Sequence, residues 1–466
     1  MTTERFTAPT SVDVVVVGGG PVGMLAAAEI ALGGVSVVVI ESRTSVDTRP
    51  RAGTVHARSL SLLARRGYLP AVPAADLADR ADAVRRAPFQ FAAQPILSIT
   101  APATETAPIA GIPQASLEAA FEARARESGA TVLRGHTALA LEQTATEVRL
   151  RYADPAGTEH ELVAAYAVGA DGARSLVAAS GDFPETTYPA TMHAIAALAS
   201  APDANTPPPG WHQADGGWTL HNPNPGGPAR IIAMDFSGPR HNREIPTERE
   251  YFDALRAVLG EAPQLREVHG LTRFSDFGRY RERLCDGRLL LAGDAAHVHY
   301  PLGGQGLNTG MQDAFALGWR LARVVTRADN PTVLEDYSRE RVTVAAVVVG
   351  NTVLQSRMMA PDGTDLRDAV AAMLTVPQVH DALAEVISGQ FQQRFQTDLA
   401  VHGARGTLRS LTELLAAGRH VALRPDEHTP FPPLPSGTVT ATGKLTPEPA
   451  WTSAVIRPDG YLADVL

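Results

Sequence analysis

The chain has 466 residues, 44% of them apolar, which allows two or three domains with a sizeable core. Its formal net charge of −9 argues against a nucleic-acid-binding surface, and its single cysteine, Cys285, excludes an intrachain disulfide or a Cys-x-x-Cys redox pair. The N-terminus lacks an apolar signal region and no apolar run approaches the ~20 residues that span a bilayer, so we expect a cytoplasmic protein without membrane partners.

The most regular stretch of the sequence, residues 11–41, predicts a strand, a glycine-rich turn, a helix and a second strand. A valine run at 14–17 is typical of a strand buried on both faces. The turn has the G-x-G-x-x-G spacing, with glycines at Gly18, Gly20 and Gly23. Such a turn lets the backbone approach a pyrophosphate, which the N-terminus of the helix at 23–32 attracts. With Glu41 placed to accept a ribose hydroxyl, the stretch predicts an adenine dinucleotide site.

Two later segments continue the α/β pattern. Residues 112–130 place Leu117 and Phe121 at i, i+4 spacing and predict an amphipathic helix. Residues 141–165 alternate in polarity around an Asp-Pro-Ala-Gly turn and predict a hairpin or meander. The arginine pair at 65–66 is interpreted as solvated surface charge.

The composition changes over residues 182–275, where proline and glycine clusters separate short apolar strands such as 231–236. This pattern predicts a second, β-sheet domain, joined by part of residues 85–100, which predicts a further strand. Large side chains at strand spacing are candidates for a ligand pocket, although the same spacing is common in an ordinary core. These candidates are Trp211, Trp218, His221, Met234 and Phe236.

A further apolar strand, 289–291, ends in Gly293 and Asp294, and a glycine-rich loop at 303–306 then opens a long helix. This stretch resembles the Gly-Asp motif of the flavin-dependent aromatic hydroxylases, single-component FAD monooxygenases of the para-hydroxybenzoate hydroxylase fold. Residues 168–175 (VGADGARS) resemble the Asp-Gly motif of the same family, so three motifs follow in the family's order. The resemblance covers residues 12 to 400 and is strongest for hydroxylases of aromatic polyketides and related antibiotics.

The resemblance implies bound FAD. In the family the Gly-Asp aspartate, here Asp294, binds a hydroxyl of the ribityl chain, and the loop from Pro301 forms a wall beside the reactive flavin carbon. The helix N-terminus near 306–309 would stabilise the reduced, anionic flavin through its amides and dipole. The cofactor residues that these motifs predict are Gly18, Gly20, Pro21, Val22, Gly23, Glu41, Arg43, Arg51, Gln114, Asp171, Gly172, Gly293, Asp294, Pro301, Gly304, Gln305, Gly306, Leu307 and Asn308.

The resemblance also implies a reaction. Because the chain has one dinucleotide fingerprint, NADPH or NADH is expected to dock transiently, reduce FAD and leave. O2 would add at flavin C4a to give a hydroperoxide, which a phenolic polycyclic substrate attacks in a dry pocket. The general base is not identified; His221, and Arg279 as a partner of a phenolate, are candidates. Two alternatives stay open: Baeyer–Villiger oxygen insertion on a polyketide ketone, and a non-catalytic flavin-bearing protein that binds an aromatic ligand.

These expectations combine into an α/β fold with a discontinuous, Rossmann-like FAD-binding domain. It covers 1–181 and 276–395, including a helical extension, and a substrate-binding sheet domain covers 182–275. The C-terminal region, 396–466, resembles a shortened thioredoxin-like domain whose role would be packing or contact in a homodimer. Its proline-rich stretch at 429–437 stands where a strand and helix would be expected.

Three local features qualify the resemblance. Ala178 stands where the family often has an arginine, which weakens the expected nicotinamide contact. Lys444 is the only lysine and lies near the C-terminus, which argues against the halogenases that share this fold and use a lysine. His297 and His299 form an H-x-H pair, but because they lie inside the flavin motif we predict no metal site.

Overall fold

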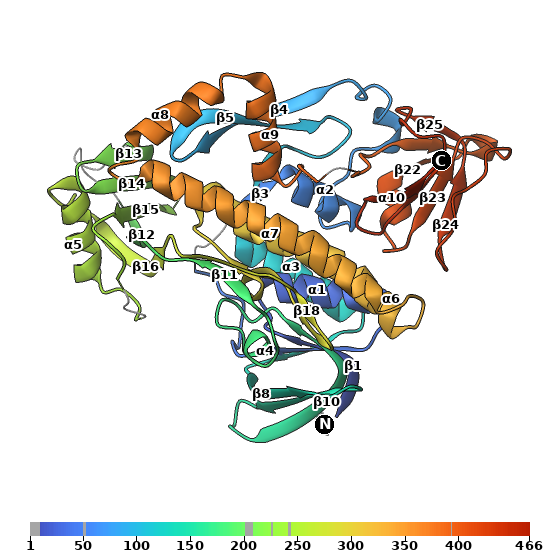
Figure 1. Cartoon of the computed structure of the whole chain (residues 1–466), viewed down its shortest axis with the longest axis horizontal. Helices are drawn as coiled ribbons and strands as arrows, with labels where there is room; N and C mark the ends of the chain where they lie inside the picture. Colours follow the sequence, from blue (N-terminus) through green and yellow to red (C-terminus); the bar gives the residue numbers. More distant parts are fainter. Residues whose placement is uncertain (1–9, 50–52, 201–207, 225–226, 241–243, 393) are drawn as a thin grey trace.

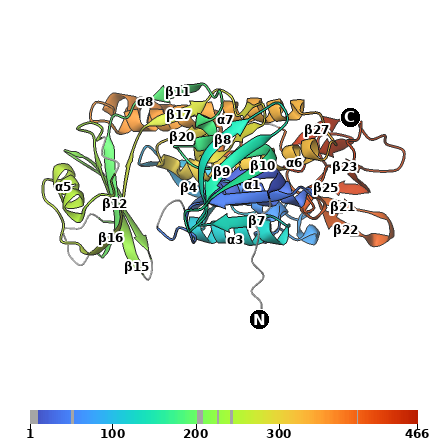
Figure 2. The ribbon, with the colours of Figure 1, turned by 90° about the horizontal axis from the view of Figure 1, so that it is seen from below.

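The computed structural model describes residues 10–49, 53–200, 208–224, 227–240, 244–392 and 394–466. Within these residues the fold is a mixed α/β arrangement (Figure 1). Figure 2 shows a five-stranded sheet at one end and the small C-terminal sheets at the other, with a layered α/β body between them. The division into domains predicted above remains a prediction.

The central body is built on an eight-stranded sheet. Its strands are β1 (Ser11–Val17), β2 (Val37–Glu41), β7 (Thr131–Arg134), β8 (Thr137–Gln143), β9 (Val148–Ala153), β10 (Glu159–Gly169), β18 (Cys285–Asp286) and β19 (Leu289–Leu291). The parallel strands follow the order β7-β2-β1-β10-β19, so the carboxyl ends of β1, β2, β10 and β19 meet at one edge. β8 and β9 extend β10 as the predicted antiparallel meander.

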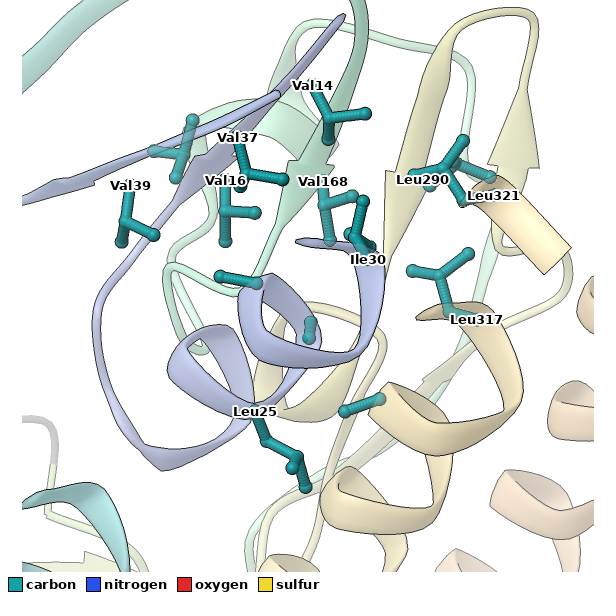
Figure 3. Packing of buried hydrophobic residues seen from close by; sticks show 14 of the residues in the cluster. Val14, Val16, Leu25, Ile30, Val37, Val39, Val168, Leu290, Leu317 and Leu321 are labelled. Carbon is teal, nitrogen blue, oxygen red and sulfur yellow. The ribbon is translucent and has the colours of Figure 1, made fainter. Parts of the chain in front are cut away.

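Helix α1 (Pro21–Leu32) packs against both α3 (Gln114–Glu127) and α6 (Gln305–Val325), and buried side chains of the three helices share one hydrophobic cluster with the sheet. Figure 3 shows Ile30 of α1 beside Val168 and Leu317 of α6 near Leu290, all of them fully buried. α1 and α6 approach closely because Gly318 lies against Glu29, where a β-carbon would clash. α1 begins at Pro21, two residues before the predicted start, since proline suits the first helical position.

The remaining helices are α2 (Ala57–Arg65), α4 (Leu176–Ala179), α5 (Glu248–Leu259), α7 (Thr332–Met359), α8 (Thr364–Met373), α9 (Pro377–Ser388) and α10 (Leu411–Leu415). α7 crosses the molecule from the five-stranded sheet towards the C-terminal region (Figure 1). By length and composition alone α7 could span a membrane, and the α8–α9 pair, bent by 109°, passes the same test only as a broken span. Because 56% of the apolar window of α7 is buried inside the structure, it also has the properties of a core helix.

The second sheet is antiparallel. Its strands, in hydrogen-bonded order, are β13 (Gly210–Ala214), β14 (Gly217–Asn224), β15 (Gly227–Asp235), β12 (His193–Ser200) and β16 (Arg266–Ser275). Alternate residues face opposite sides. Ile195, Ile231 and Ala233 pack on α5, whereas Trp218 and Met234 belong to the cluster on the other face.

The stretch at 85–100 differs from its prediction. It forms a hairpin of β4 (Val84–Phe91) and β5 (Gln94–Pro102) whose hydrogen bonds are internal, although its apolar side chains pack against the five-stranded sheet. The chain reverses at Ala92 and Ala93, with φ values of 47° and 65°. Alanine rarely adopts this left-handed conformation, so the sequence shows no turn signal there.

Short strands connect these parts. They are β3 (Thr54–His56) with β6 (Ile109–Gly111), and β11 (Glu185–Tyr188), β17 (Gly278–Arg281) and β20 (His297–Val298). β11 lies in the stretch assigned to the substrate sheet, but it pairs with β17 beside the central body.

The C-terminal region contains two small sheets and one short helix. The strands are β21 (Ala400–His402), β22 (Leu408–Ser410), β23 (Val421–Arg424), β24 (Val439–Thr442), β25 (Lys444–Thr446), β26 (Ala454–Ile456) and β27 (Leu462–Val465). Residues 429–437 form neither helix nor strand. The thioredoxin-like character of this region remains a prediction.

The interpretation of Arg65 and Arg66 as solvated charges is wrong. Both are buried, with exposed fractions of 1% and 3%. Arg65 pairs with Glu105 at 3.0 Å, and Arg66 pairs with Glu29 at 3.0 Å while donating to backbone carbonyls of the C-terminal region. A helix face that packs against a second part of the chain is not distinguishable from a solvated one by local sequence.

Candidate functional site

The glycine turn between β1 and α1 has one packed side and one open side. A β-carbon at Gly18 would clash with Ala170, and one at Gly23 would clash with Gly18, so both glycines are required for close packing. At Gly20 no atom lies within 4 Å of a built β-carbon. No side chain caps the N-terminus of α1, so its first amides are available to an anion on the open side.

Glu41 lies at the end of β2 beside this turn. Its two carboxylate oxygens accept hydrogen bonds from the amides of Gly19, at 2.6 Å, and Arg43, at 2.7 Å. The oxygen bound by Arg43 also accepts the Ser42 hydroxyl at 3.4 Å, whereas the oxygen bound by Gly19 keeps a second lone-pair direction that can accept a ribose hydroxyl. Arg43 lies 3.6 Å from the Asp47 carboxylate, and Arg51 is outside the described residues.

The Asp-Gly motif follows the end of the neighbouring strand β10. Asp171 accepts the amide of Leu176 at 2.6 Å, and burial raises the pKa of its carboxyl group. Gly172 adopts a φ of 82°, and the space around a built β-carbon there is open. Ala178, at the position of the family arginine, is buried in α4.

The Gly-Asp motif follows β19 at the same edge of the sheet. Gly293 has a φ of 61° and donates its amide to Asp313 of α6 at 3.0 Å. Asp313 also accepts from His297 at 2.7 Å and from Arg341 at 2.6 Å. Burial raises the pKa of Asp313, but Arg341 and His297 outweigh it and hold the pKa below its usual value. Asp313 therefore holds the backbone of the motif at Gly293 from the buried side, whereas Asp294 is exposed.

Arg279 connects the two aspartate motifs. Its guanidinium donates to the carbonyls of Ala173, at 3.0 Å, and Asp294, at 3.4 Å, and lies 3.7 Å from Glu185. Burial, followed by the nearby Arg281, lowers its pKa. The structure thus places Arg279 at the two cofactor motifs, and its role as a partner of a phenolate stays a prediction.

The loop from Pro301 to Gly304 leads into α6. Gly303 and Gly304 have φ values of 72° and 64°, and no side chain caps the helix N-terminus. α6 begins at Gln305, close to the predicted start, so the amides of Gln305, Gly306 and Leu307 lie in its uncapped first turn. Gln114, another predicted cofactor residue, is half-buried at the start of α3.

Four of the five predicted pocket residues gather on one face of the five-stranded sheet. Trp218 and Met234 are buried there, and Trp211 and Phe236 pack against the same cluster. The Trp218 indole donates to the carbonyl of Met359 at 2.8 Å, which joins the sheet to the end of α7.

The fifth candidate, His221, lies on the opposite face. It pairs directly with Ile231, whose side chain faces α5. Its neighbour in the strand, Leu220, packs instead against the cluster that contains Trp218 and Met234. His221 therefore cannot act as the base for a ligand on the pocket face.

Sequence reasoning missed Tyr300, which joins the two halves of the site. It is fully buried beside Pro301, and its hydroxyl donates to the sulfur of Met234 at 3.0 Å. Its place between an H-x-H pair and Pro301 in the motif loop was the available signal. Through Tyr300 the glycine loop contacts the apolar face of the five-stranded sheet.

These residues fit an adenine dinucleotide such as FAD. Three motif loops meet at one edge of the parallel strands, the usual ligand position in such sheets. Gly20 and Gly172 leave open space where side chains would obstruct a ligand. Within the described ranges, no group of three or more His, Cys, Asp or Glu side chains could hold a metal ion.

Comparisons with known proteins agree with this geometry. The model of the FAD binding domain family matches residues 11–352. The 12-dehydrotetracycline 5-monooxygenase/anhydrotetracycline 6-monooxygenase of Streptomyces rimosus is 32% identical, over 97% of this chain and 94% of that protein.

Two solved structures extend the comparison. The anhydrotetracycline hydroxylase OxyS from Streptomyces rimosus has a TM-score of 0.85 and 30% identity, covering 98% of this chain and 95% of its own. The Diels-Alderase PyrE3 of pyrroindomycin biosynthesis has a TM-score of 0.83 and 28% identity, covering 98% and 96%. The chain belongs to the FAD-binding domain family and, within it, to the flavin-dependent aromatic hydroxylases, which are monooxygenases.

Proposed function

We propose that this protein uses NADPH or NADH and O2 to hydroxylate a phenolic polycyclic aromatic substrate of the polyketide type. The contact between Tyr300 and Met234 is the observation that carries the proposal, since it seats the cofactor loop against an apolar face rich in aromatic side chains. The similarity to monooxygenases that act on anhydrotetracycline supports the same substrate class.

Different residues of the chain would bind different parts of FAD. The α1 N-terminus and Glu41 would bind the pyrophosphate and a ribose, and Asp294 the ribityl chain. The uncapped N-terminus of α6 would place amides and a positive dipole end beside the flavin ring. When bound, FAD supplies a hydride acceptor and the carbon at which O2 is activated.

The protein's remaining tasks are positioning the substrate and excluding water. The buried cluster around Trp218, Met234 and Tyr300 offers a flat aromatic substrate an apolar wall. With one dinucleotide-binding turn in the chain, the nicotinamide cofactor would bind transiently. We expect the protein to act in the cytoplasm, and a homodimer remains a hypothesis.

Anaerobic stopped-flow reduction tests this function. The holoprotein is mixed with NADPH or NADH, with and without a panel of polycyclic phenols, while the flavin absorbance is followed. Reduction accelerated by one phenol would support a substrate-gated hydroxylase. An NMR assignment of the new oxygen would then separate ring hydroxylation from Baeyer–Villiger insertion, because both add one oxygen atom.

A second candidate is ring closure by cycloaddition without redox chemistry. The structural similarity to the Diels-Alderase PyrE3 over nearly the whole chain favours it. It predicts conversion of a linear polyene substrate without NADPH and no ligand-stimulated flavin reduction. Ligand binding with neither reaction would instead point to the flavin-bearing binding protein.

A further inference from the structure

We propose that His56 is a positioning residue that fixes the glycine loop at the cofactor site by holding the carbonyl of Gly303. The proposal rests on the proposed function for its catalytic consequence, but its geometric basis is independent of the reaction.

His56 ends strand β3 and is fully buried. Its Nε2 lies 2.7 Å from the Gly303 carbonyl oxygen, a short hydrogen bond between parts of the chain 247 residues apart. The imidazole packs edge-to-face against Phe89, with ring centroids 5.3 Å apart and an interplanar angle of 80°. The ring is therefore held on one side by packing and on the other by the loop.

The loop needs such support because its backbone conformation is unusual. Gly303 and Gly304 are both left-handed, and the one backbone hydrogen bond from the Gly304 amide, to Pro301, is long at 3.4 Å. The next carbonyl, that of Gly304, is held by the Asn308 amide at 2.8 Å. Two consecutive carbonyls of the loop are thus each held by a side chain.

Asn308 also joins the loop to β3 itself. Its Oδ1 accepts the backbone amide of His56 at 2.9 Å, and its Nδ2 donates to the Thr54 carbonyl at 2.9 Å. The side chain of Asn308 is therefore committed to backbone groups, which leaves its backbone amide for the predicted cofactor contact. β3 and the loop form one hydrogen-bonded unit in which the His56 imidazole provides the contact to Gly303.

The charge state of His56 suits this role. Burial lowers its pKa to about 4, and the hydrogen bond to Gly303 offsets this only in part, so the imidazole is neutral at pH 7. A carbonyl accepts hydrogen bonds and does not donate them, which places the single proton on Nε2. Nδ1 is then a buried acceptor without a partner in the described structure.

Without this hydrogen bond the loop would gain freedom directly before α6, whose first amides face the flavin in the proposed function. We therefore expect weaker FAD binding and looser closure of the site. Looser closure would admit water, so that more of the NADPH consumed would yield hydrogen peroxide rather than hydroxylated product.

The test compares His56→Phe, which keeps ring packing on Phe89 but lacks the donor, with His56→Gln, whose longer amide can donate to Gly303. His420→Phe is the matched control: His420 is also buried, packs edge-to-face on Trp319 and has its pKa lowered to about 4 by burial, but lies in the C-terminal region. The readouts are the FAD dissociation constant of the apoprotein from flavin fluorescence, the visible spectrum of bound flavin, and product formed per NADPH.

His56→Phe is expected to weaken FAD binding about tenfold, the equivalent of one good hydrogen bond, and to shift the flavin spectrum. His56→Gln should recover most of the affinity, and His420→Phe should leave it unchanged. Equal affinities and spectra for His56→Phe and His420→Phe would overturn the proposal, as would a His56→Gln variant as weak as His56→Phe.

If His56→Phe fails to fold, His56→Gln against His56→Asn carries the same comparison, because the shorter amide cannot reach Gly303. An absence of NADPH-dependent oxygenation in the wild type would contradict the proposed function. The FAD affinity and spectrum would still decide the role of His56.

Discussion

At the scale of single residues, the candidate site depends on buried side chains that form hydrogen bonds to the backbone of the motif loops. The Asp313 carboxylate accepts hydrogen bonds from the Gly293 amide, from His297 and from Arg341. Since both Asp313 and Arg341 are buried, the carboxylate compensates a charge that would otherwise be unpaired in the core.

Asp313→Asn should therefore destabilise the protein strongly. The asparagine can still accept the Gly293 amide, but Arg341 loses its buried counter-ion at a cost of ~3–5 kcal/mol. Urea unfolding of the apoprotein measures this change. Asp336→Asn, which removes an exposed partner of Arg339, is the control and should change stability by less than ~1 kcal/mol. Equal effects of the two substitutions would contradict the assigned role of Asp313.

At the scale of elements, strand register decides which side chains belong to the apolar face around Trp218. Met234 and His221 occupy neighbouring strands of one sheet, yet they lie on opposite faces. A shift of one residue in either strand would exchange these faces, and nothing in the local sequence specifies the register.

The register yields a direct prediction. Met234→Ala should remove ~2–5 kcal/mol of packing and leave the Tyr300 hydroxyl unpaired, which raises the KM for the substrate and lowers the yield of product per NADPH. His221→Ala should leave kcat/KM within about twofold of the wild-type value, because the His221 side chain lies on the α5 face of the sheet, opposite the Trp218 cluster. Loss of hydroxylation in a folded His221→Ala variant would show that this histidine reaches the substrate.

The contact between α2 and the C-terminal region contains a group that titrates near neutrality. Burial, and then the neighbouring Glu105, raise the pKa of Asp398 to about 7, although Arg65 opposes them. The folded pKa lies above the unfolded value of 3.8, so the protonated carboxyl group favours the folded state. Its contribution to the free energy of unfolding is fully present below pH 4. Between pH 4 and pH 7 the contribution declines by ~1.4 kcal/mol per pH unit, and above pH 7 it is lost.

Asp398→Asn should remove this pH dependence while keeping the acceptor for the Leu399 and Thr412 amides. Thermal unfolding of both proteins from pH 5 to pH 8 measures the difference. The melting temperature of the wild type should fall further between pH 5 and pH 8 than that of the variant. Parallel curves would mean that Asp398 is ionised throughout.

Local signals predicted some elements well and others not at all. The strand, glycine turn and helix at 11–41 were predictable from local sequence. A strand buried on both faces needs a run of apolar residues, and a backbone that approaches a pyrophosphate closely needs glycines at fixed spacing. The turn at Ala92 and Ala93 was not, because tertiary packing overrides alanine's own preference there. The burial of Arg65 and Arg66 also depends on a partner region more than 300 residues later.

At the scale of the whole molecule, α7 connects the parts that these elements form. Near its start Glu340 pairs with Arg320 and Arg457, and at its end the Met359 carbonyl accepts the Trp218 indole. One helix therefore contacts both the C-terminal region and the five-stranded sheet. Such contacts join distant segments of sequence, so no single window of residues could predict them.

The central claim is that the assembled site transfers an oxygen atom from O2 to an aromatic substrate. The most direct measurement is turnover under ¹⁸O2 with NADPH and the phenol that most accelerates flavin reduction, followed by mass spectrometry of the product. We predict one ¹⁸O atom in the product, with NADPH consumed in proportion. A product that contains no ¹⁸O, or that forms at the same rate without NADPH, would contradict the central claim.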